Sequence, residues 1–116
     1  MSVSQEKRDK LHLLHIRDSA EKVEGYSNGL SYEKFAKSKL EYDAIMLQIV
    51  VIGEAVNDLG KELKEKYRKL PWRQIIDTRN HIAHGYFDID TKTAWDIATE
   101  DLPKLKREVE KILEKM

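Results

Sequence analysis

Residues 44–52 read AIMLQIVVI, the longest apolar run in the chain, interrupted only by Gln48. On a helix these side chains cover nearly every face, and a helix of that kind is buried on several sides. Ser38 stands three residues before Glu41, which is the capping-box pattern of a helix start. We therefore expect a central helix from Ser38 to about Gly60. The run is far too short to span a membrane.

The rest of the chain also favours helices, because five glycines and two prolines leave few breaks. Gly25 is the expected end of a first helix, Pro71 the expected start of a later one, and Gly85 its expected end. The other expected elements are a short helix capped by Ser31, a charged helical extension over residues 61–69, and a final helical stretch that begins at Asp90 or Thr91.

Pro103 lies inside this final stretch, where a proline kinks or splits a helix, and Asp101 is the expected cap of a second piece. Leu105, Val109 and Ile112 then recur at helical spacing to the end of the chain. The pattern predicts an all-α fold, an antiparallel up-and-down bundle of about four or five helices. We expect one domain over residues 1–116. Part of the apolar surface of the central helix should stay uncovered and suggests a homodimer.

The composition excludes several classes of function. The chain has 116 residues with 21 basic and 21 acidic side chains, so it lacks the net positive charge of a protein that coats nucleic acid. It has no cysteine, which rules out disulfides and thiolate sites and is compatible with a reducing, cytoplasmic setting. The charged start MSVSQEKRDK is not typical of a signal peptide. No cofactor is expected.

The candidate site is RNHIAHGY, residues 79–86. Asn80 and His84 are four apart and share a face of the expected helix, with Arg79 on the adjacent flank. His84 falls at the C-terminal end, and Gly85 is the residue that leaves the helix. Tyr86 follows in a loop. The spacing predicts that these polar groups converge at one helix end.

These residue types suit phosphodiester cleavage without a metal ion. The negative pole of a helix favours a protonated imidazole, and histidine is the usual general acid–base catalyst near neutral pH. The planar fork of arginine matches phosphate oxygens. The interpretation is RNA cleavage in which the 2′-hydroxyl attacks phosphorus, His84 moves protons and Arg79 holds the charge. One motif gives one strong proton carrier unless His81 joins it, and a two-fold dimer supplies a second His84 and a second Arg79.

Each of these residues also has a structural alternative. Arg79 could be an ion-pair partner of Asp77, Asp88 or Glu54, and for Glu54 we favour a structural role. His84 could be a simple helix-cap histidine, and Asn80 could satisfy loop backbone or support the site. Tyr86 could belong to the core or to an interface.

Other candidates are weaker. The pairs His12/His15 and His81/His84 have a spacing that can share a metal, but the sequence indicates no third ligand, so we expect no metal site. A basic cluster precedes the motif and could guide RNA, although Glu62 and Glu65 dilute it and favour a solvated face. The cluster comprises Lys61, Lys64, Lys66, Arg68, Lys69 and Arg73.

The motif R-x4-H-x-Y, formed by Arg79, His84 and Tyr86, resembles the signature of the HEPN superfamily. Three segments are similar to its HepT-like branch, the toxins of prokaryotic toxin–antitoxin pairs. They are VIGEAV (51–56), PWRQIIDTRNHIAHGYF (71–87) and WDIATEDLPKLK (95–106). The similarity extends over nearly the whole chain in the same order.

The resemblance implies an antiparallel helical bundle that forms homodimers and acts as a metal-independent ribonuclease. It implies that Arg79 and His84 are catalytic. It also implies a neighbouring minimal nucleotidyltransferase, similar to the MntA antitoxin, that transfers AMP to Tyr86 and so blocks phosphate entry by charge and bulk. His81 occupies a position that the family pattern leaves open.

Two alternatives from other classes stay open. The cleft could bind a nucleotide or an RNA end without cutting it and serve a partner nucleotidyltransferase. The chain could also be a purely structural dimerisation bundle. RNA cleavage that survives chelation and disappears in a His84→Ala variant distinguishes the first hypothesis from both.

Overall fold

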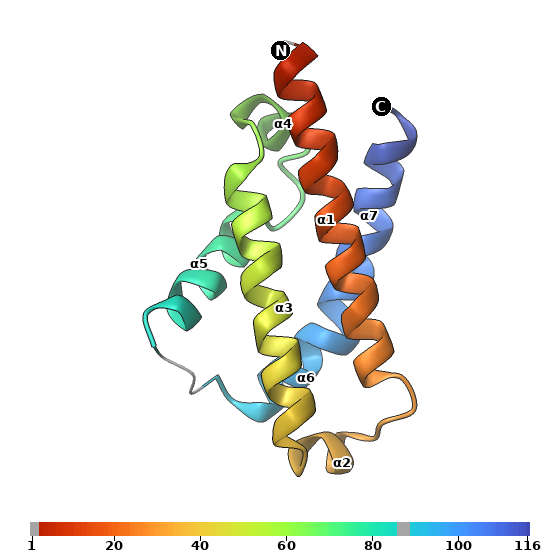
Figure 1. Ribbon diagram of the computed structural model, residues 1–116, viewed down its shortest axis with the longest axis vertical. Coiled ribbons are helices and arrows are strands. Elements are labelled where there is room, and N and C mark those ends of the chain that lie inside the picture. The colour runs from red at the N-terminus through yellow and green to blue at the C-terminus, as the bar shows by residue number, and fades with distance from the viewer. Residues whose placement is uncertain (1–2, 86–88) are drawn as a thin grey trace.

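The structure is a computed structural model that describes residues 3–85 and 89–116. In these residues every regular element is helical (Figure 1), which confirms the all-α prediction. The bundle measures 47 × 29 × 21 Å. Its long helices are α1 (Val3–Ser27), α3 (Lys39–Asp58), α5 (Trp72–Ala83) and α7 (Leu102–Glu114). The short elements are α2 (Tyr32–Ala36), α4 (Lys61–Lys66), α6 (Thr91–Asp96) and a π-helical turn, η1 (Ile97–Asp101), between α6 and α7.

The long helices run up and down, with α3 against α1 on one side and α5 on the other, and α7 beside α1 (Figure 1). The short helices α2 and α4 lie at opposite ends of the bundle. Ile45, Ile52 and Val56 of α3 are fully or almost fully buried, as the central position of this helix requires. Leu47 is nevertheless 60% exposed and Leu40 77% exposed, so α3 keeps one uncovered apolar face.

Several helix starts are where the capping residues predict them. The Ser31 hydroxyl accepts a hydrogen bond from the backbone N–H of Lys34 at 3.2 Å. The Ser38 hydroxyl accepts one from the N–H of Glu41 at 3.5 Å. Each bond satisfies a backbone donor that the first helical turn leaves free. Pro71 directly precedes α5, also as expected.

Two helix ends differ from the prediction. Gly25 lies inside α1, which continues to Ser27, and the chain reverses at Gly29, whose φ is +80°. A glycine weakens a helix only modestly, so a helix continues through one when its neighbours pack well, as buried Val23 does here. The charged extension is a separate short helix, α4, because Leu59 and Gly60 are extended, and it ends at Lys66.

Asp101 is not the cap of a separate helix, contrary to expectation. Its backbone is helical, its side chain makes no capping bond, and the chain passes from α6 through η1 into α7 without a break. Pro103 stands in the first turn of α7, directly after the π-helical turn. Proline is tolerated in the first turn of a helix, because the backbone N–H that it lacks would otherwise need a partner in the preceding turn.

A buried carboxylate that the sequence did not indicate joins α1 to the α3–α4 connection. Asp9 is completely buried, and its Oδ1 accepts hydrogen bonds from the Gly60 N–H at 2.8 Å and from Gln5 Nε2 at 2.9 Å. A second polar tie joins α7 to α1, since Lys106 Nζ lies 3.3 Å from Glu24 Oε2. The hydrogen bond to Glu24 raises the pKa of Lys106 above its usual value. None of the helices in the described part of the chain has the length and apolar character that crossing a bilayer requires.

Candidate functional site

Arg79 projects from the core-facing side of α5. Trp72, Ile75 and Ile82 make the apolar stripe that packs α5 against α3, and Arg79 falls within this stripe at helical spacing. Its Cβ and Cγ lie directly over Gly53 of α3, where an added Cβ would stand 2.6 Å from Arg79 Cγ. The Arg79 Nε is buried without a hydrogen-bond partner. The stem of this side chain is therefore held between the two helices.

The guanidinium tip reaches the surface and is oriented by two neighbours. Nη1 donates to Asn80 Oδ1 at 3.0 Å, and Nη2 donates to Glu54 Oε1 at 3.3 Å. Glu54, one of the three alternatives, is thus an ion-pair partner of Arg79. Asp77 pairs with Arg73 instead, at 3.4 Å, and Asp88 lies outside the described residues.

His84 ends α5 as the sequence predicts. The following Gly85 has a φ of +88°, the left-handed conformation that a helix end of this type needs. His84 Nδ1 lies 3.1 Å from the backbone oxygen of Asn80, and the imidazole is exposed. A carbonyl oxygen can only accept, so Nδ1 carries the hydrogen in this contact. In the neutral ring, Nε2 then offers its lone pair to solvent.

Asn80 links the two groups. Its side-chain oxygen accepts from Arg79 while its backbone oxygen accepts from His84, so these three residues meet at one exposed edge of α5. Tyr86, the predicted modification site, lies outside the described residues. The edge offers one permanent cation and one imidazole to a ligand, a pairing that suits phosphate binding and proton transfer.

The other candidates lie elsewhere. His81 lines a separate cavity of about 400 Å³ with Asp77, Thr78 and residues of α6 and η1. The rings of His12 and His15 are 6.3 Å apart on α1. Among residues 3–85 and 89–116, no three His, Asp or Glu side chains are grouped so that they could hold a metal ion. The basic cluster lies on and after α4, at the end of the bundle opposite α2 (Figure 1).

Sequence reasoning did not identify the close approach at Gly53. A signal was present, since Gly53 and Glu54 are neighbours in the otherwise apolar stretch of residues 49–56. The glycine permits the approach of Arg79, and the next residue holds its guanidinium. These two positions act on Arg79 from across the helix interface.

Comparison with known proteins shows the family. The family model described as "Ribonuclease HepT-like" matches residues 16–112, and the chain belongs to this family. The resemblance drawn from the motif and its flanking segments is thereby confirmed. The comparison with solved structures found no match for this chain.

Several similar proteins have names that describe a ribonuclease. "Putative RNase TTE0752" of Caldanaerobacter subterraneus is 33% identical over 109 residues, which are 94% of this chain and 97% of that protein. "Probable ribonuclease HepT" of Thermococcus cleftensis is 29% identical over 103 residues, 89% of this chain and 94% of its own. "Gamma-glutamylcyclotransferase and putative RNase MJ0434" of Methanocaldococcus jannaschii is 36% identical over 107 residues, 92% of this chain. The match spans about half of that protein, 48% of its length.

The contact at Gly53 gives a first prediction. A Gly53→Ala variant should unfold more easily, by about 1–3 kcal/mol, because the added methyl group overlaps the Arg79 side chain. Denaturant unfolding followed by circular dichroism measures the change. The matched control is Gly25→Ala, where nothing lies within 4 Å of the added carbon. That helix-interior change should raise stability by roughly 0.5–1 kcal/mol. Equal effects of the two substitutions would contradict the packing argument.

Proposed function

We propose that this protein is an endoribonuclease that cleaves RNA without a metal ion, with Arg79 and His84 at the reacting phosphate. The observation that carries the proposal is the edge of α5, where an oriented guanidinium and an exposed imidazole both contact Asn80. Membership of the HepT-like family and the ribonuclease names of its relatives support the same general activity.

The reaction proceeds by internal transesterification. Nε2 of His84 takes the proton of a ribose 2′-hydroxyl, and the 2′-oxygen attacks the adjacent phosphorus. Arg79 donates hydrogen bonds to the phosphate oxygens as charge builds on them. The bond from phosphorus to the 5′-oxygen breaks, and that oxygen takes a proton from a second imidazolium. The products are a 2′,3′-cyclic phosphate and a 5′-hydroxyl.

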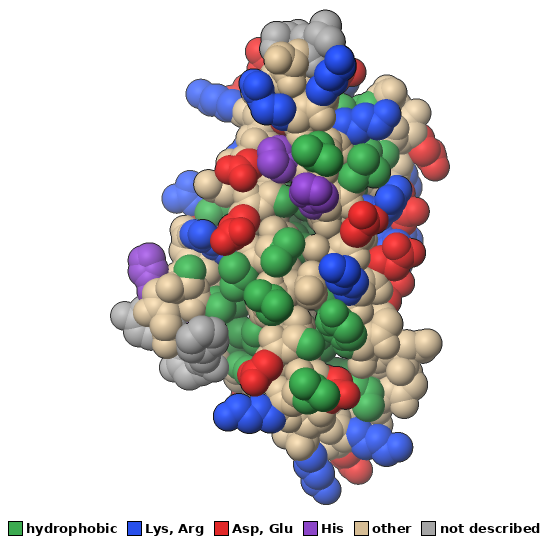
Figure 2. All heavy atoms as spheres, viewed as in Figure 1, with side chains coloured by type: hydrophobic (Ala, Val, Ile, Leu, Met, Phe, Trp, Pro, Cys, Tyr) green, Lys and Arg blue, Asp and Glu red, His purple; other side chains and the backbone are tan. Residues whose placement is uncertain are grey.

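The second imidazolium comes from a homodimer in this proposal, as His84 of the partner subunit. On α3, Leu47, Val51 and Glu54 follow one another at helical spacing, so the uncovered apolar face leads directly to the Glu54–Arg79 pair. Leu11 of α1 is also 51% exposed. Figure 2 shows apolar side chains gathered over the face that α1 and α3 form. A second copy seated here by a two-fold axis brings two motif edges to one cleft.

The proposed setting is a type VII-like toxin–antitoxin pair. The partner is a minimal nucleotidyltransferase that transfers AMP from ATP to Tyr86: the phenolic oxygen loses its proton, attacks the α-phosphorus and displaces pyrophosphate. Tyr86 follows His84 by two residues in the sequence, and an attached AMP adds bulk and a negative charge that oppose the entry of an RNA phosphate. This part of the proposal rests on the family resemblance and on the intact motif.

Substitution of His84 tests the activity. His84→Ala should lower the rate of RNA cleavage roughly 10²–10⁴-fold, because the proton carrier is lost. Cleavage by the unaltered protein should persist in excess EDTA. Labelled RNA resolved on denaturing gels gives both rates, with His81→Ala as the control on the same helix. RNA binding without cleavage by the unaltered protein would favour a non-catalytic nucleotide- or RNA-binding module instead.

Substitution of Leu47 tests the shared cleft. Leu47→Glu places a charge on the apolar face, so the dimer should dissociate and cleavage should fall together with dimer content. Analytical ultracentrifugation and the cleavage assay measure the two quantities on one sample. Arg107→Glu, an exposed change on α7, is the control. A fully active monomer would contradict the shared cleft.

Substitution of Tyr86 tests the regulation. Co-expression with a nucleotidyltransferase encoded beside the gene should add the mass of one AMP to the protein and abolish cleavage. Tyr86→Phe should gain no mass and should stay active, because it lacks the acceptor oxygen. Intact-protein mass spectrometry reports the modification. Equal neutralisation of both proteins would show that the partner acts by binding alone.

A further inference from the structure

Glu54 contacts Arg79 through a carboxylate that stays open to solvent. Its Oε1 lies 3.3 Å from Arg79 Nη2, and the exposed fraction of its side chain is 55%, against 32% for that of Arg79. The residues on either side, Gly53 and Ala55, are buried in the helix packing, so Glu54 projects from a fixed part of α3. The backbone therefore places the carboxylate beside the guanidinium, while water reaches both groups.

The burial of Arg79 limits how it can bind a phosphate. A guanidinium makes a two-point contact either through Nε and a terminal nitrogen or through its two terminal nitrogens. Arg79 Nε is buried without a hydrogen-bond partner, and the stem of the side chain lies against Gly53. A phosphate that makes a two-point contact with Arg79 therefore uses Nη1 and Nη2.

Each of these two nitrogens already has an acceptor, and the two acceptors differ in charge. Nη1 donates to the neutral amide oxygen of Asn80 at 3.0 Å, whereas Nη2 donates to the carboxylate of Glu54 at 3.3 Å. A phosphate on both nitrogens would meet no repelling charge at Asn80. At Glu54 it would meet a second anion on the same nitrogen, and like charges at such a distance repel.

The Glu54 contact is weak enough to be replaced. An exposed ion pair contributes little, because water solvates both partners well when they are apart. A phosphate bound to both terminal nitrogens makes two charge-assisted hydrogen bonds, where Glu54 makes one. The displaced carboxylate can turn into solvent, because more than half of its side chain is already exposed.

We propose that Glu54 is an internal competitor, which occupies Arg79 in the absence of RNA and so sets the RNA concentration at which the site fills. The inference rests on the proposed ribonuclease function and concerns the regulation of that same site. A role in which Glu54 only positions Arg79 makes the opposite prediction, since its loss would then slow the reaction instead of strengthening binding.

The variant Glu54→Gln tests the competition, because it keeps the shape and the acceptor oxygen and removes the charge. It should bind a 2′-O-methyl RNA, which cannot be cleaved because its 2′-oxygens are blocked, about two- to fivefold more tightly than the unaltered protein. Fluorescence anisotropy gives both Kd values. Glu54→Asp, which keeps the charge, should bind less tightly than Glu54→Gln.

Cleavage kinetics distinguish competition from positioning. With cleavable RNA, the KM of Glu54→Gln should fall by the same factor as its Kd, while kcat should stay unchanged. The reason is that a competitor for Arg79 opposes the bound substrate and the transition state alike. A lower kcat without tighter binding would overturn the inference and make Glu54 a positioning residue.

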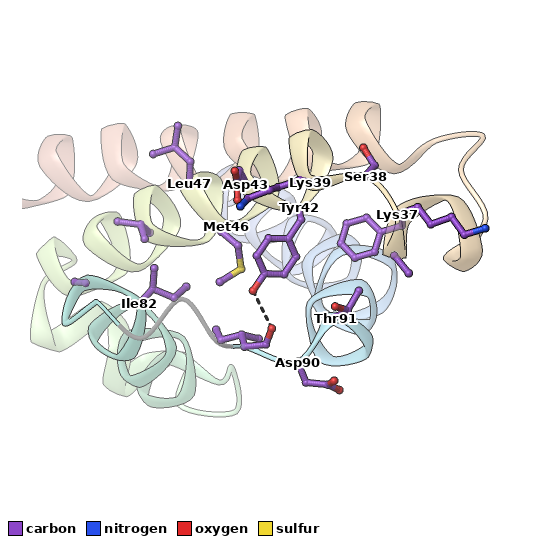
Figure 3. Close-up of a pocket in the computed structure, with 15 residues that line it drawn as sticks. Lys37, Ser38, Lys39, Tyr42, Asp43, Met46, Leu47, Ile82, Asp90 and Thr91 are labelled. Carbon is purple, nitrogen blue, oxygen red and sulfur yellow. Dashed lines mark hydrogen bonds between the residues drawn. The ribbon is translucent and has the colours of Figure 1, made fainter.

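Two further variants separate the contact from net charge. Asp43 is also exposed on α3, and Figure 3 shows it near the start of this helix. It lies roughly 16 Å along the axis from Glu54, beyond a Debye length of about 10 Å, so Asp43→Asn should bind like the unaltered protein. In an Arg79→Gln background, Glu54→Gln should lose most of its effect, because the group for which it competes is absent. Equal tightening by Glu54→Gln and Asp43→Asn would overturn the inference.

Glu54 adjoins the proposed dimer face, so analytical ultracentrifugation of the same samples is part of the test. Tighter binding at an unchanged dimer content supports the inference. Tighter binding that only follows a higher dimer content would overturn it, because the substitution would then act through the interface.

The outcomes separate this inference from the proposed function. If the unaltered protein cleaves RNA and Glu54→Gln binds the 2′-O-methyl strand no more tightly, Glu54 is not a competitor and the ribonuclease stands. If the unaltered protein neither cleaves nor binds any RNA, the proposed function fails and the inference fails with it.

Discussion

The close contact between Gly53 of α3 and the stem of Arg79 on α5 sets the geometry of the site. Without a side chain at position 53, the two helices approach until the arginine stem fills the interface. The guanidinium can then emerge only at the edge of α5, where Asn80 and Glu54 receive it. A packing constraint between two helices thus decides where a positive charge is presented.

The Glu54–Arg79 pair is suited to exchange with a substrate. Glu54 is 55% exposed and the Arg79 side chain 32% exposed, and ion pairs of this kind contribute only about 0–1 kcal/mol. In the proposed function, the phosphate of the RNA displaces this carboxylate and gains a stronger, two-point contact with the guanidinium. Until then Glu54 holds the fork in a defined direction. His84 is oriented differently, through the backbone of Asn80, so its ring does not depend on the ion pair.

Most of the helix boundaries were predictable because they depend on local chemistry. Ser31, Ser38 and Gly85 each act within a few residues of themselves, and all three do what their types predict. The same local rules failed at Gly25 and Asp101, where packing of the whole helix decides whether it continues. The prediction treated each as an isolated signal.

In the candidate site, too, local spacing predicts some features and contacts between distant segments decide the others. The sequence places Arg79, Asn80 and His84 on one helix end by spacing alone, and the structure brings them together there. Contacts between distant segments were predicted incompletely. Glu54 was one of three possible partners for Arg79. The approach at Gly53 had only the neighbouring Gly53 and Glu54 as a signal, and the buried carboxylate of Asp9 had no local signature. Both depend on which helices become neighbours, which periodicity does not specify.

The π-helical turn of residues 97–101 has a consequence for the register of the chain. Such a turn holds one residue more than the α-helix around it, so it offsets the faces of α6 and α7 by roughly 100°. Trp95 on α6 meets Phe35 of α2, while Leu105 and Val109 on α7 face the core. Deletion of one residue from this turn would join α6 and α7 into one continuous α-helix. Their apolar faces would then fall out of phase, and α6 would turn Trp95 away from α2.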